Sequence, residues 1–204
     1  MVTKALLVHI HAKHGQAGDV EALLTSALRD VEREPGTAAW FAVRFGRGHY
    51  GIFDAFPDEV SRDAHLDGPV ASVLAQATGE LLDEPPDIHR LDVLASKLPS
   101  GPVGEVHKGL LLTFTAKAGH VPDVEQFLQR GRQIVEEEPG TAAWFAIRLD
   151  DRRYGIFDVF PDNGARFAHL TGRVPRELAK HALELLGSFP DMDMLNVLAH
   201  KLPS

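Results

Sequence analysis

The chain has 204 residues, of which 44% are hydrophobic and 25% charged, a composition typical of folded globular proteins. Its formal net charge of -8 at pH 7 disfavours a nucleic-acid partner, because phosphate contacts need clustered Lys and Arg. The lack of cysteine excludes disulfides, a thiol nucleophile and Cys-ligated metals, and no apolar run is long enough for a membrane span or a signal-peptide core. We therefore predict a cytoplasmic protein.

The first strand and the first helix are predicted near the N-terminus. Lys4–His11 is apolar on both faces at its start, as expected for a buried strand. Asp19 follows a loop with two glycines and is expected to cap a helix, which Pro35-Gly36 ends. The apolar residues of this helix recur at three- and four-residue spacing, and so form one stripe. They are Val20, Leu23, Leu24, Ala27, Leu28 and Val31.

Two further strands are predicted to form a β-hairpin. They cover Thr37–Phe45 and His49–Phe56, and Gly46-Arg47-Gly48 supplies a glycine-rich turn between them. Apolar residues occur on both faces of these strands, as they do where both faces of a sheet are covered. We therefore expect packing partners on both sides of the hairpin.

The rest of the first half is predicted to form a broken helix and a closing strand. Asp58 is the expected N-cap, Gly68-Pro69 interrupts the helix, and Pro85-Pro86 ends it. Ile88–Lys97 then forms the last strand. The resulting order, β-α-β-β-α-β, is the split-βαβ arrangement of ferredoxin-like domains.

The second half of the chain repeats the first without a gap at a spacing of 104 residues, with about half of the positions identical. The longest match aligns 34–42 with 138–146. We therefore predict an α+β protein with ferredoxin-like domains at 1–100 and 105–204, joined by a linker at 101–104. The two sheets are expected to pack face to face, with the helices outside, as an internal pseudo-dimer.

The hairpin brings together residues that suit the wall of a binding site. If it is centred on Arg47, Trp40 pairs with Asp54 and Arg44 with Tyr50 on one face, so that the indole N–H meets a carboxylate. These four residues are the candidate substrate-binding set of the first half. The alternative is that the tryptophan belongs to the core and the aspartate only satisfies it. The second half repeats the set as Trp144, Asp158, Arg148 and Tyr154.

Two helix histidines are the candidate catalytic residues. His65 and His169 occupy the same position in the two halves, and no other histidine recurs at the repeat spacing. Imidazole suits proton transfer near neutral pH, so we predict that these residues act as general bases. The alternative is a surface or packing role, which is common for a single histidine on a helix.

A second group of histidines raises the question of a metal. His9 and His11 lie on one face of the first predicted strand, with His14 nearby, which could form a metal-binding pair. The second half has Thr113 and Thr115 at the matching positions. The alternative, a solvated or polar pocket edge, is favoured, and we predict no metal site.

Short motifs in both halves resemble the antibiotic biosynthesis monooxygenase family. They are Glu-Pro-Gly-Thr at 34–37, Phe-Asp-x-Phe at 53–56 and Ala-His-Leu-x-Gly at 64–68. The resemblance covers nearly the whole of each half. It implies a dimeric α/β barrel with a pocket between sheet and helices in each half, and cofactor-free oxidation of quinol-like or anthrone-like aromatics. The helix histidine of that family falls on His65 and His169.

The predicted function is therefore that of a cofactor-independent monooxygenase, an oxidoreductase that acts on a small aromatic substrate. The alternative is a protein of the same fold that binds or senses a small molecule without turnover. No cofactor is expected, and heme cleavage is disfavoured because heme-degrading relatives use an asparagine on the first strand, which residues 1–11 and 105–115 lack. The expected partner is a small aromatic molecule rather than nucleic acid or membrane, and homo-oligomers beyond the internal pair stay open.

Overall fold

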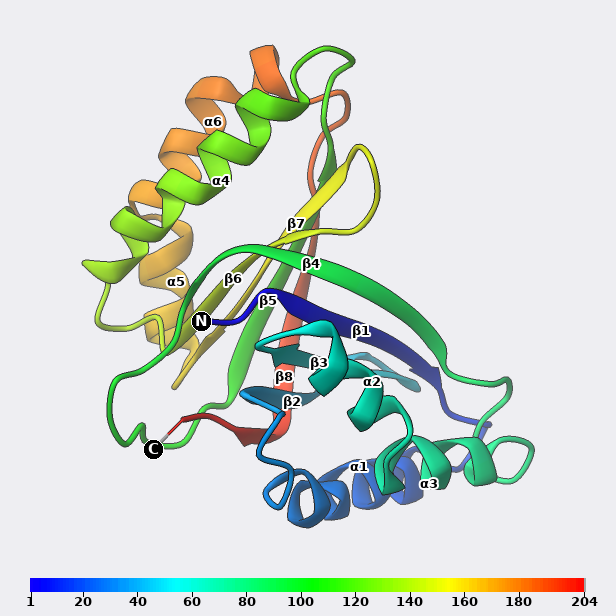
Figure 1. The fold of residues 1–204 in the computed structure, drawn as a ribbon. Coiled ribbons are helices and arrows are strands. Elements are labelled where there is room, and N and C mark those ends of the chain that lie inside the picture. Colours follow the sequence, from blue (N-terminus) through cyan, green and yellow to red (C-terminus); the bar gives the residue numbers. More distant parts are fainter. Residues whose placement is uncertain (204) are drawn as a thin grey trace. The chain divides into compact units, whose positions relative to one another are not determined.

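The structure is a computed structural model that describes residues 1–203, apart from the side chains of Val174, Leu178, Ala182 and Leu183. Strands and helices follow one another in two βαββαβ series, in which the second helical region is split into two helices (Figure 1). The elements are β1 Lys4–His11, α1 Ala17–Val31, β2 Ala39–Gly46, β3 His49–Phe56, α2 Glu59–Leu66, α3 Pro69–Ala77, β4 Asp87–Lys97, β5 Lys108–Thr115, α4 Val121–Glu136, β6 Ala143–Arg148, β7 Arg153–Phe160, α5 Asn163–Leu170, α6 Arg173–Leu185 and β8 Asp191–Lys201.

The predicted fold class is confirmed. Along the hydrogen-bonded ladder the strand order is β1-β3-β2-β8-β5-β7-β6-β4, that of a closed antiparallel barrel. In each half the two central strands of the βαββαβ series form the predicted hairpin, and the helices of that half lie on one side of its strands (Figure 1). This arrangement combines α+β composition with two ferredoxin-like halves.

The chain divides into two compact units, and each contains the end of a long strand from the other half of the repeat. The first unit comprises residues 1–91 and 195–203, and the second unit comprises 92–194. Within the first unit, the end of β8 pairs with β2, from Trp40 opposite Lys201 to Arg44 opposite Asn196. Within the second unit, the end of β4 pairs with β6 in the same way. β4 and β8 are 11 residues long, whereas β1 and β5, their other neighbours in the strand order, are 8 residues long. The two long strands therefore have residues left to pair with β6 and β2. The domain boundaries drawn from the repeat stay a prediction.

The core of the first unit lies between the hairpin sheet and α1–α3. Alternate residues of β1, β2 and β3 point toward these helices, as the two-residue period of a strand requires. Trp40, Tyr50 and Phe56 are the largest side chains of this layer, and each is at most 1% exposed. The opposite face of the same strands is also buried, as Phe41 and Phe53 show. The prediction that both faces need cover is therefore confirmed.

The register of the hairpin is the one predicted. Trp40 lies opposite Asp54 and Arg44 opposite Tyr50, with an irregularity in the register directly after Arg44. Gly48 in the turn has φ of +73°, a left-handed conformation that glycine adopts without steric cost. The hairpin of the second half pairs Trp144 with Asp158 in the same way.

The helix boundaries match the prediction at the start of α2 and differ at α1 and at the end of α3. α3 ends at Ala77, so the prediction that it extends to Pro85-Pro86 is wrong. The side chain of Asp58 accepts a hydrogen bond from Ser61 N at 2.8 Å, which confirms it as N-cap, and α3 begins anew at Pro69. α1, however, begins at Ala17, so the prediction that Asp19 caps it is wrong. Asp19 lies instead in the first turn, where a carboxylate also interacts favourably with the helix dipole.

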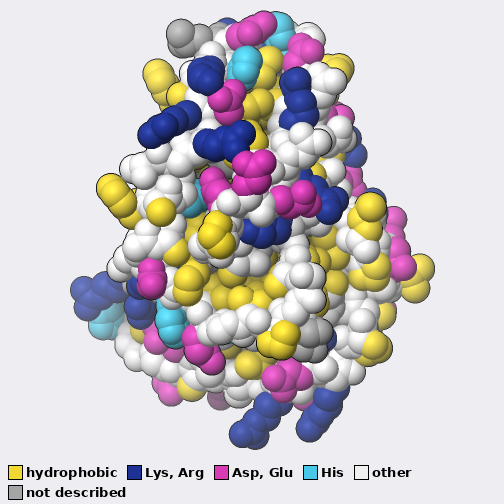
Figure 2. Space-filling view, turned by 90° about the vertical axis from the view of Figure 1, so that its left-hand side faces the viewer, with side chains coloured by type: hydrophobic (Ala, Val, Ile, Leu, Met, Phe, Trp, Pro, Cys, Tyr) yellow, Lys and Arg dark blue, Asp and Glu magenta, His cyan; other side chains and the backbone are white. Residues whose placement is uncertain are grey.

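On the face seen in Figure 2, Lys and Arg side chains are interspersed with Asp and Glu, and hydrophobic side chains gather on the lower part. None of the helices described in residues 1–203 is both long enough and apolar enough to cross a membrane.

Gly51 is expected to be the most restricted glycine of the hairpin. A Cβ atom there would lie 2.5 Å from Val8 O and 2.8 Å from the ring of Phe45. Gly51→Ala should therefore lower the free energy of unfolding by roughly 1–3 kcal/mol, as overpacking does. Urea denaturation measures the change. Gly18→Ala is the control, because its Cβ would meet nothing within 4 Å and α1 should gain up to about 1 kcal/mol. Equal effects of the two changes would contradict the packing described for β3.

Candidate functional site

A carboxylate, an imidazole and a second carboxylate meet at the end of the sheet in the first unit. Asp54 projects from β3 toward the helices, and His65 comes from the last turn of α2, whose N-cap fixes where the helix begins. Glu34 follows α1 in the turn that contains Pro35. Asp54 and His65 are 1% and 6% exposed. Three elements that are distant in sequence thus place three titratable groups in one buried site.

Both ring nitrogens of His65 lie against a carboxylate. Nδ1 is 2.6 Å from Oε2 of Glu34, and Nε2 is 3.0 Å from Oδ2 of Asp54. The hydroxyl of Thr37 donates a hydrogen bond of 2.7 Å to the same Glu34 oxygen. The ring of Phe56 lies 5.4 Å from the imidazole, centroid to centroid. We call Glu34, His65 and Asp54 the first triad.

The second unit contains the same arrangement. Nδ1 of His169 lies 2.6 Å from Oε2 of Glu138, and its Nε2 lies 3.1 Å from Oδ2 of Asp158. Thr141 donates to Glu138 as Thr37 donates to its counterpart. We call Glu138, His169 and Asp158 the second triad. Because the repeat preserves all of these residue types, both units build the same electrostatic environment.

The triads keep their histidines charged. Burial alone lowers the pKa of His65, but the carboxylates of Asp54 and Glu34 outweigh burial and raise it to about 9. The same balance raises the pKa of His169 to about 10. Burial raises the pKa of Asp54, although the histidine acts in the opposite direction. Because two carboxylates face its ring, His65 is an imidazolium at neutral pH.

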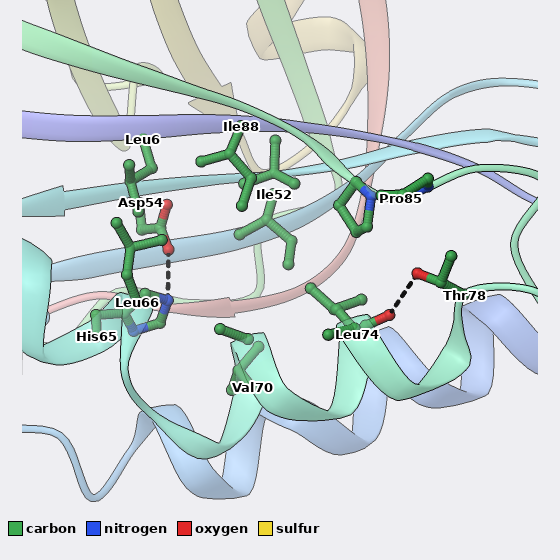
Figure 3. Close-up of a pocket in the computed structure, with 14 residues that line it drawn as sticks. Leu6, Ile52, Asp54, His65, Leu66, Val70, Leu74, Thr78, Pro85 and Ile88 are labelled. Atoms are coloured by element: carbon green, nitrogen blue, oxygen red, sulfur yellow. Dashed lines mark hydrogen bonds and ion pairs between the residues drawn. The ribbon is translucent and has the colours of Figure 1, made fainter.

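Asp54 and His65 form the polar end of a cavity of about 370 Å³ in the first unit (Figure 3). A volume of this size is typical of small-molecule pockets. In Figure 3 one oxygen of Asp54 meets His65 and the other points away from the imidazole. That second oxygen, Oδ1, is buried and has no hydrogen-bond partner among residues 1–203. The other lining residues are mostly apolar: Leu6, Val8, Ile52, Leu66, Val70, Ala71, Leu74, Ala75, Thr78, Pro85, Pro86 and Ile88.

Arg44 and Tyr50 are brought together, but on α1 and not on the cavity lining. The Arg44 guanidinium lies 2.9 Å from Glu21, and the Tyr50 hydroxyl donates to the same carboxylate at 3.0 Å. The same hydroxyl lies 3.2 Å from the carbonyl of Ala17. The cavity lining accordingly contains Asp54 from the predicted substrate-binding set and none of the other three residues.

Trp40 does not make the contact expected from the hairpin register. Its side chain is fully buried, but Nε1 has no hydrogen-bond partner in the part of the chain that the structure describes. The expectation that the indole donates to Asp54 is wrong, because His65 reaches that carboxylate from α2. Trp40 thus packs in the core of the first unit.

The corresponding residues of the second unit behave alike. Arg148 lies 2.5 Å from Asp92 and 3.3 Å from Glu125, and the Tyr154 hydroxyl donates to Glu125 at 3.0 Å. Burial, with help from Glu125, raises the pKa of Tyr154 to about 12. Trp144 is fully buried in the core of its unit.

Glu34 and Lys201 are site residues that the sequence analysis missed. The amine of Lys201, at the end of β8, donates to the carbonyls of Val31 at 2.8 Å and Glu34 at 2.7 Å. It thereby holds the turn that carries the Glu34 side chain. In the second unit Lys97 makes the same pair of bonds to Val135 and Glu138. The available signal was the repeat, which preserves both the glutamate and the lysine.

His9 and His11 lie in a cluster with His49 and His89. Nδ1 of His9 is 3.0 Å from Nε2 of His49, and the rings of His11 and His49 stack at 4.5 Å. His89 approaches His9 edge-on, with 5.8 Å between ring centroids. Within residues 1–203, no group of three or more His, Cys, Asp or Glu side chains is arranged to hold a metal ion.

His9→Thr, which introduces the residue of the second half, should stabilise the protein in acid. Burial and then the neighbouring His49 and His89 lower the pKa of His9 to about 4, below its usual 6.5. The unfolded chain therefore binds a proton that the folded protein does not, and stability falls as pH drops from 6.5 toward 4. We expect a gain on the order of 1–2 kcal/mol at pH 4.5 after screening, and almost none at pH 7. Urea denaturation at both pH values measures it, and an equal gain at both would contradict this origin.

Comparison with known proteins adds a likeness of fold. No family model and no curated protein matches the sequence. A structure named as a putative monooxygenase, from Fusobacterium nucleatum, superposes with a TM-score of 0.86 at 12% identity, over 100% of this chain and 95% of that chain. A second structure named as a putative monooxygenase, from Lactobacillus acidophilus, superposes with a TM-score of 0.82 at 11% identity, over 99% of this chain and 97% of that chain. A ferredoxin-fold protein of Listeria monocytogenes, described as related to antibiotic biosynthesis monooxygenases, superposes with a TM-score of 0.57 at 10% identity. The match covers 97% of this chain and 95% of that chain.

Proposed function

We propose that this chain, which has the tandem dimeric α/β barrel fold of the antibiotic biosynthesis monooxygenases, is a cofactor-independent monooxygenase that acts on a small aromatic substrate. The observation that carries the proposal is the apolar cavity of the first unit, which ends in Asp54 and His65. The substrate class is quinol-like or anthrone-like, as the resemblance of the sequence motifs implies.

The chemistry needs a base and a dry pocket. Without a cofactor the substrate supplies all electrons, and an aromatic hydroxyl does so readily once it has lost its proton. For an anthrone, the CH₂ group becomes C=O, one oxygen atom of O₂ enters the product and the other leaves as water. The four electrons taken from carbon reduce both oxygen atoms, so the reaction balances without an added reductant.

The Asp54–His65 pair is suited to this proton transfer. An apolar lining excludes water, which strengthens the interaction of a developing anion with a fixed charge. The imidazolium of His65 supplies that charge, and the carboxylate of Asp54 supplies a proton acceptor. His169 and Asp158 would serve in the same way in the second unit.

Oxygen uptake by metal-free protein tests the proposal. A panel of hydroquinones and anthrones is offered, and at least one member should be oxidised faster than in buffer. His65→Gln together with His169→Gln should lower that rate about 10²- to 10³-fold, as loss of a fixed group that stabilises a developing anion does. His107→Gln, at an exposed histidine, is the control and should keep the rate. The proposal fails if no member of the panel is oxidised faster than in buffer.

Binding without turnover is the second candidate, and one observation favours it. Both nitrogens of His65 contact carboxylates, so the ring has no unoccupied nitrogen to offer a substrate. In this case a panel member should raise the melting temperature with no oxygen uptake, since ligand that binds only the folded state stabilises it.

A further inference from the structure

We infer that Oδ1 of Asp54 is the atom that accepts the substrate's proton, and that the pocket of the first unit takes an apolar molecule with a single hydroxyl donor. The inference rests on the proposed function and assigns its proton acceptor and its ligand class. It differs from the sequence-based expectation, in which His65 is the base.

His65 is poorly placed to accept a proton. Its Nδ1 lies 2.6 Å from Glu34 and its Nε2 lies 3.0 Å from Asp54, so each nitrogen already faces a negatively charged acceptor. A ring bonded in this way is stabilised as a double donor, the form with no lone pair. His65 therefore acts as a fixed positive charge beside Asp54.

Asp54, unlike His65, has an atom that is able to accept a proton. Its side chain is 1% exposed, and neither of its oxygens has a hydrogen-bond partner among the described residues. Oδ2 lies 3.0 Å from Nε2 of His65 as an ion pair, whereas Oδ1 has no ion-pair partner there either. A buried polar atom without a partner is costly, so a donor supplied by a ligand would gain a strong, charge-assisted hydrogen bond there. Burial also raises the pKa of Asp54, which brings the carboxyl closer to the pKa of a phenol and makes it a better base.

The lining selects the number of donors on the ligand. Of the other thirteen lining residues besides Asp54, only His65 and Thr78 have polar side chains, and the Thr78 hydroxyl lies 3.4 Å from the carbonyl of Leu74. An ammonium group has three N–H donors and would leave two unsatisfied against this surface. A carboxylate ligand would meet the negative charge of Asp54. One neutral hydroxyl matches Oδ1, the Asp54 oxygen that does not face the imidazolium of His65.

Proton transfer is balanced within this group of atoms. The O–H bond of the ligand breaks, its electron pair stays on the ligand oxygen, and the proton forms a new O–H bond on Oδ1 of Asp54. One negative charge moves from Asp54 to the ligand while the imidazolium of His65 stays in place. The net charge of the cavity is therefore unchanged, which favours the step in an apolar pocket.

Binding of 2-naphthol and 2-methoxynaphthalene at pH 7 tests the inference by calorimetry. The methyl ether keeps the ring system and the oxygen but lacks the donor. The wild-type protein should bind the naphthol about 10- to 100-fold more tightly, the range expected for a hydrogen bond to a charged group. Naphthalen-2-ylmethylammonium should bind more weakly than the naphthol. Equal affinity of naphthol and ether, or tighter binding of the ammonium, would overturn the inference, and neither result requires a variant.

Substitution locates the acceptor. Asp54→Asn should reduce the preference for the naphthol, and Asp54→Asn with Asp158→Asn should bring it to a few-fold or less. Asp83→Asn makes the same chemical change at an exposed carboxylate and should bind as the wild type does. Circular dichroism verifies that each variant is folded. A double variant that is folded and keeps the full preference would overturn the assignment to Asp54.

The result can be separated from that of the proposed function. If the naphthol preference depends on Asp54 but no panel member is oxidised, the oxygenase proposal fails and the assignment of ligand class holds. If a hydroquinone or anthrone is oxidised at an unchanged rate by folded Asp54→Asn, Asp158→Asn protein, the oxygenase proposal holds and Asp54 is not the acceptor.

Discussion

Replacing His65 with leucine is expected to lower the free energy of unfolding by about 3–5 kcal/mol at pH 7, the range for removing one partner of a buried ion pair. The substitution leaves Glu34 and Asp54 near each other without the cation that separates them. Asp54 is 1% exposed, so its carboxylate is poorly hydrated once its partner is lost. His169→Leu should have a similar effect through the second triad.

Urea denaturation of the single variants measures this loss. His107→Leu is the matched control, because His107 is exposed and such substitutions usually change stability by about 0.5 kcal/mol or less. A His65→Leu protein as stable as the His107→Leu protein would mean that the triad does not hold a buried charge.

Stability should fall as pH rises from about 6.5 to about 10. The pKa of His65 is raised to about 9 and that of His169 to about 10, from an unfolded value of 6.5. Between these values the folded protein keeps protons that the unfolded chain has lost, so stabilisation is complete below pH 6.5 and is lost toward the folded pKa values. Each histidine contributes a slope of about 1.4 kcal/mol per pH unit within its window.

Melting temperatures between pH 6 and pH 10 measure this dependence. The wild-type protein should lose stability steeply across the range, and the slope should be much smaller in folded protein that carries His65→Leu and His169→Leu. The loss of stability caused by His9 occurs below pH 6.5, whereas the loss caused by His65 and His169 occurs above it. The free energy of unfolding should therefore be largest near pH 6.5. A wild-type profile that is flat above pH 6.5 would contradict the raised histidine pKa values.

Local features of the fold could be predicted from the sequence because short-range spacing determines them. The hairpin register follows from a hairpin centred on Arg47, and the break between α2 and α3 follows from Gly68-Pro69. The expected N-cap of α1, Asp19, lies three residues after the observed N-cap, Gln16, because Gln16 makes no side-chain cap bond that would mark the start of the helix. The exchange of strand ends was not predictable, since the pattern of β8 is equally compatible with pairing inside its own half.

The site was predicted in part, for a similar reason. The sequence predicts both His65 and Asp54 as site residues. Residue types alone cannot show that the two contact each other, and the expected contacts were between His65 and a substrate and between Asp54 and Trp40. That contact joins α2 to β3, and its geometry depends on how the helix packs on the sheet. The role of Glu34 is not predictable from the sequence, because 31 residues separate it from His65 and no short-range pattern links them.

The charge on His65 is the property on which the pocket, its ligand class and the pH profile all depend. Nitrogen-15 NMR of the imidazole rings in wild-type protein, titrated from pH 5 to pH 10, measures it directly. Two of the eleven histidines, assigned through His65→Gln and His169→Gln, should keep both ring nitrogens protonated at pH 8 and titrate near pH 9 to 10. If both rings are neutral at pH 7 and titrate at or below pH 6.5, the carboxylate–imidazolium–carboxylate triads described here do not exist.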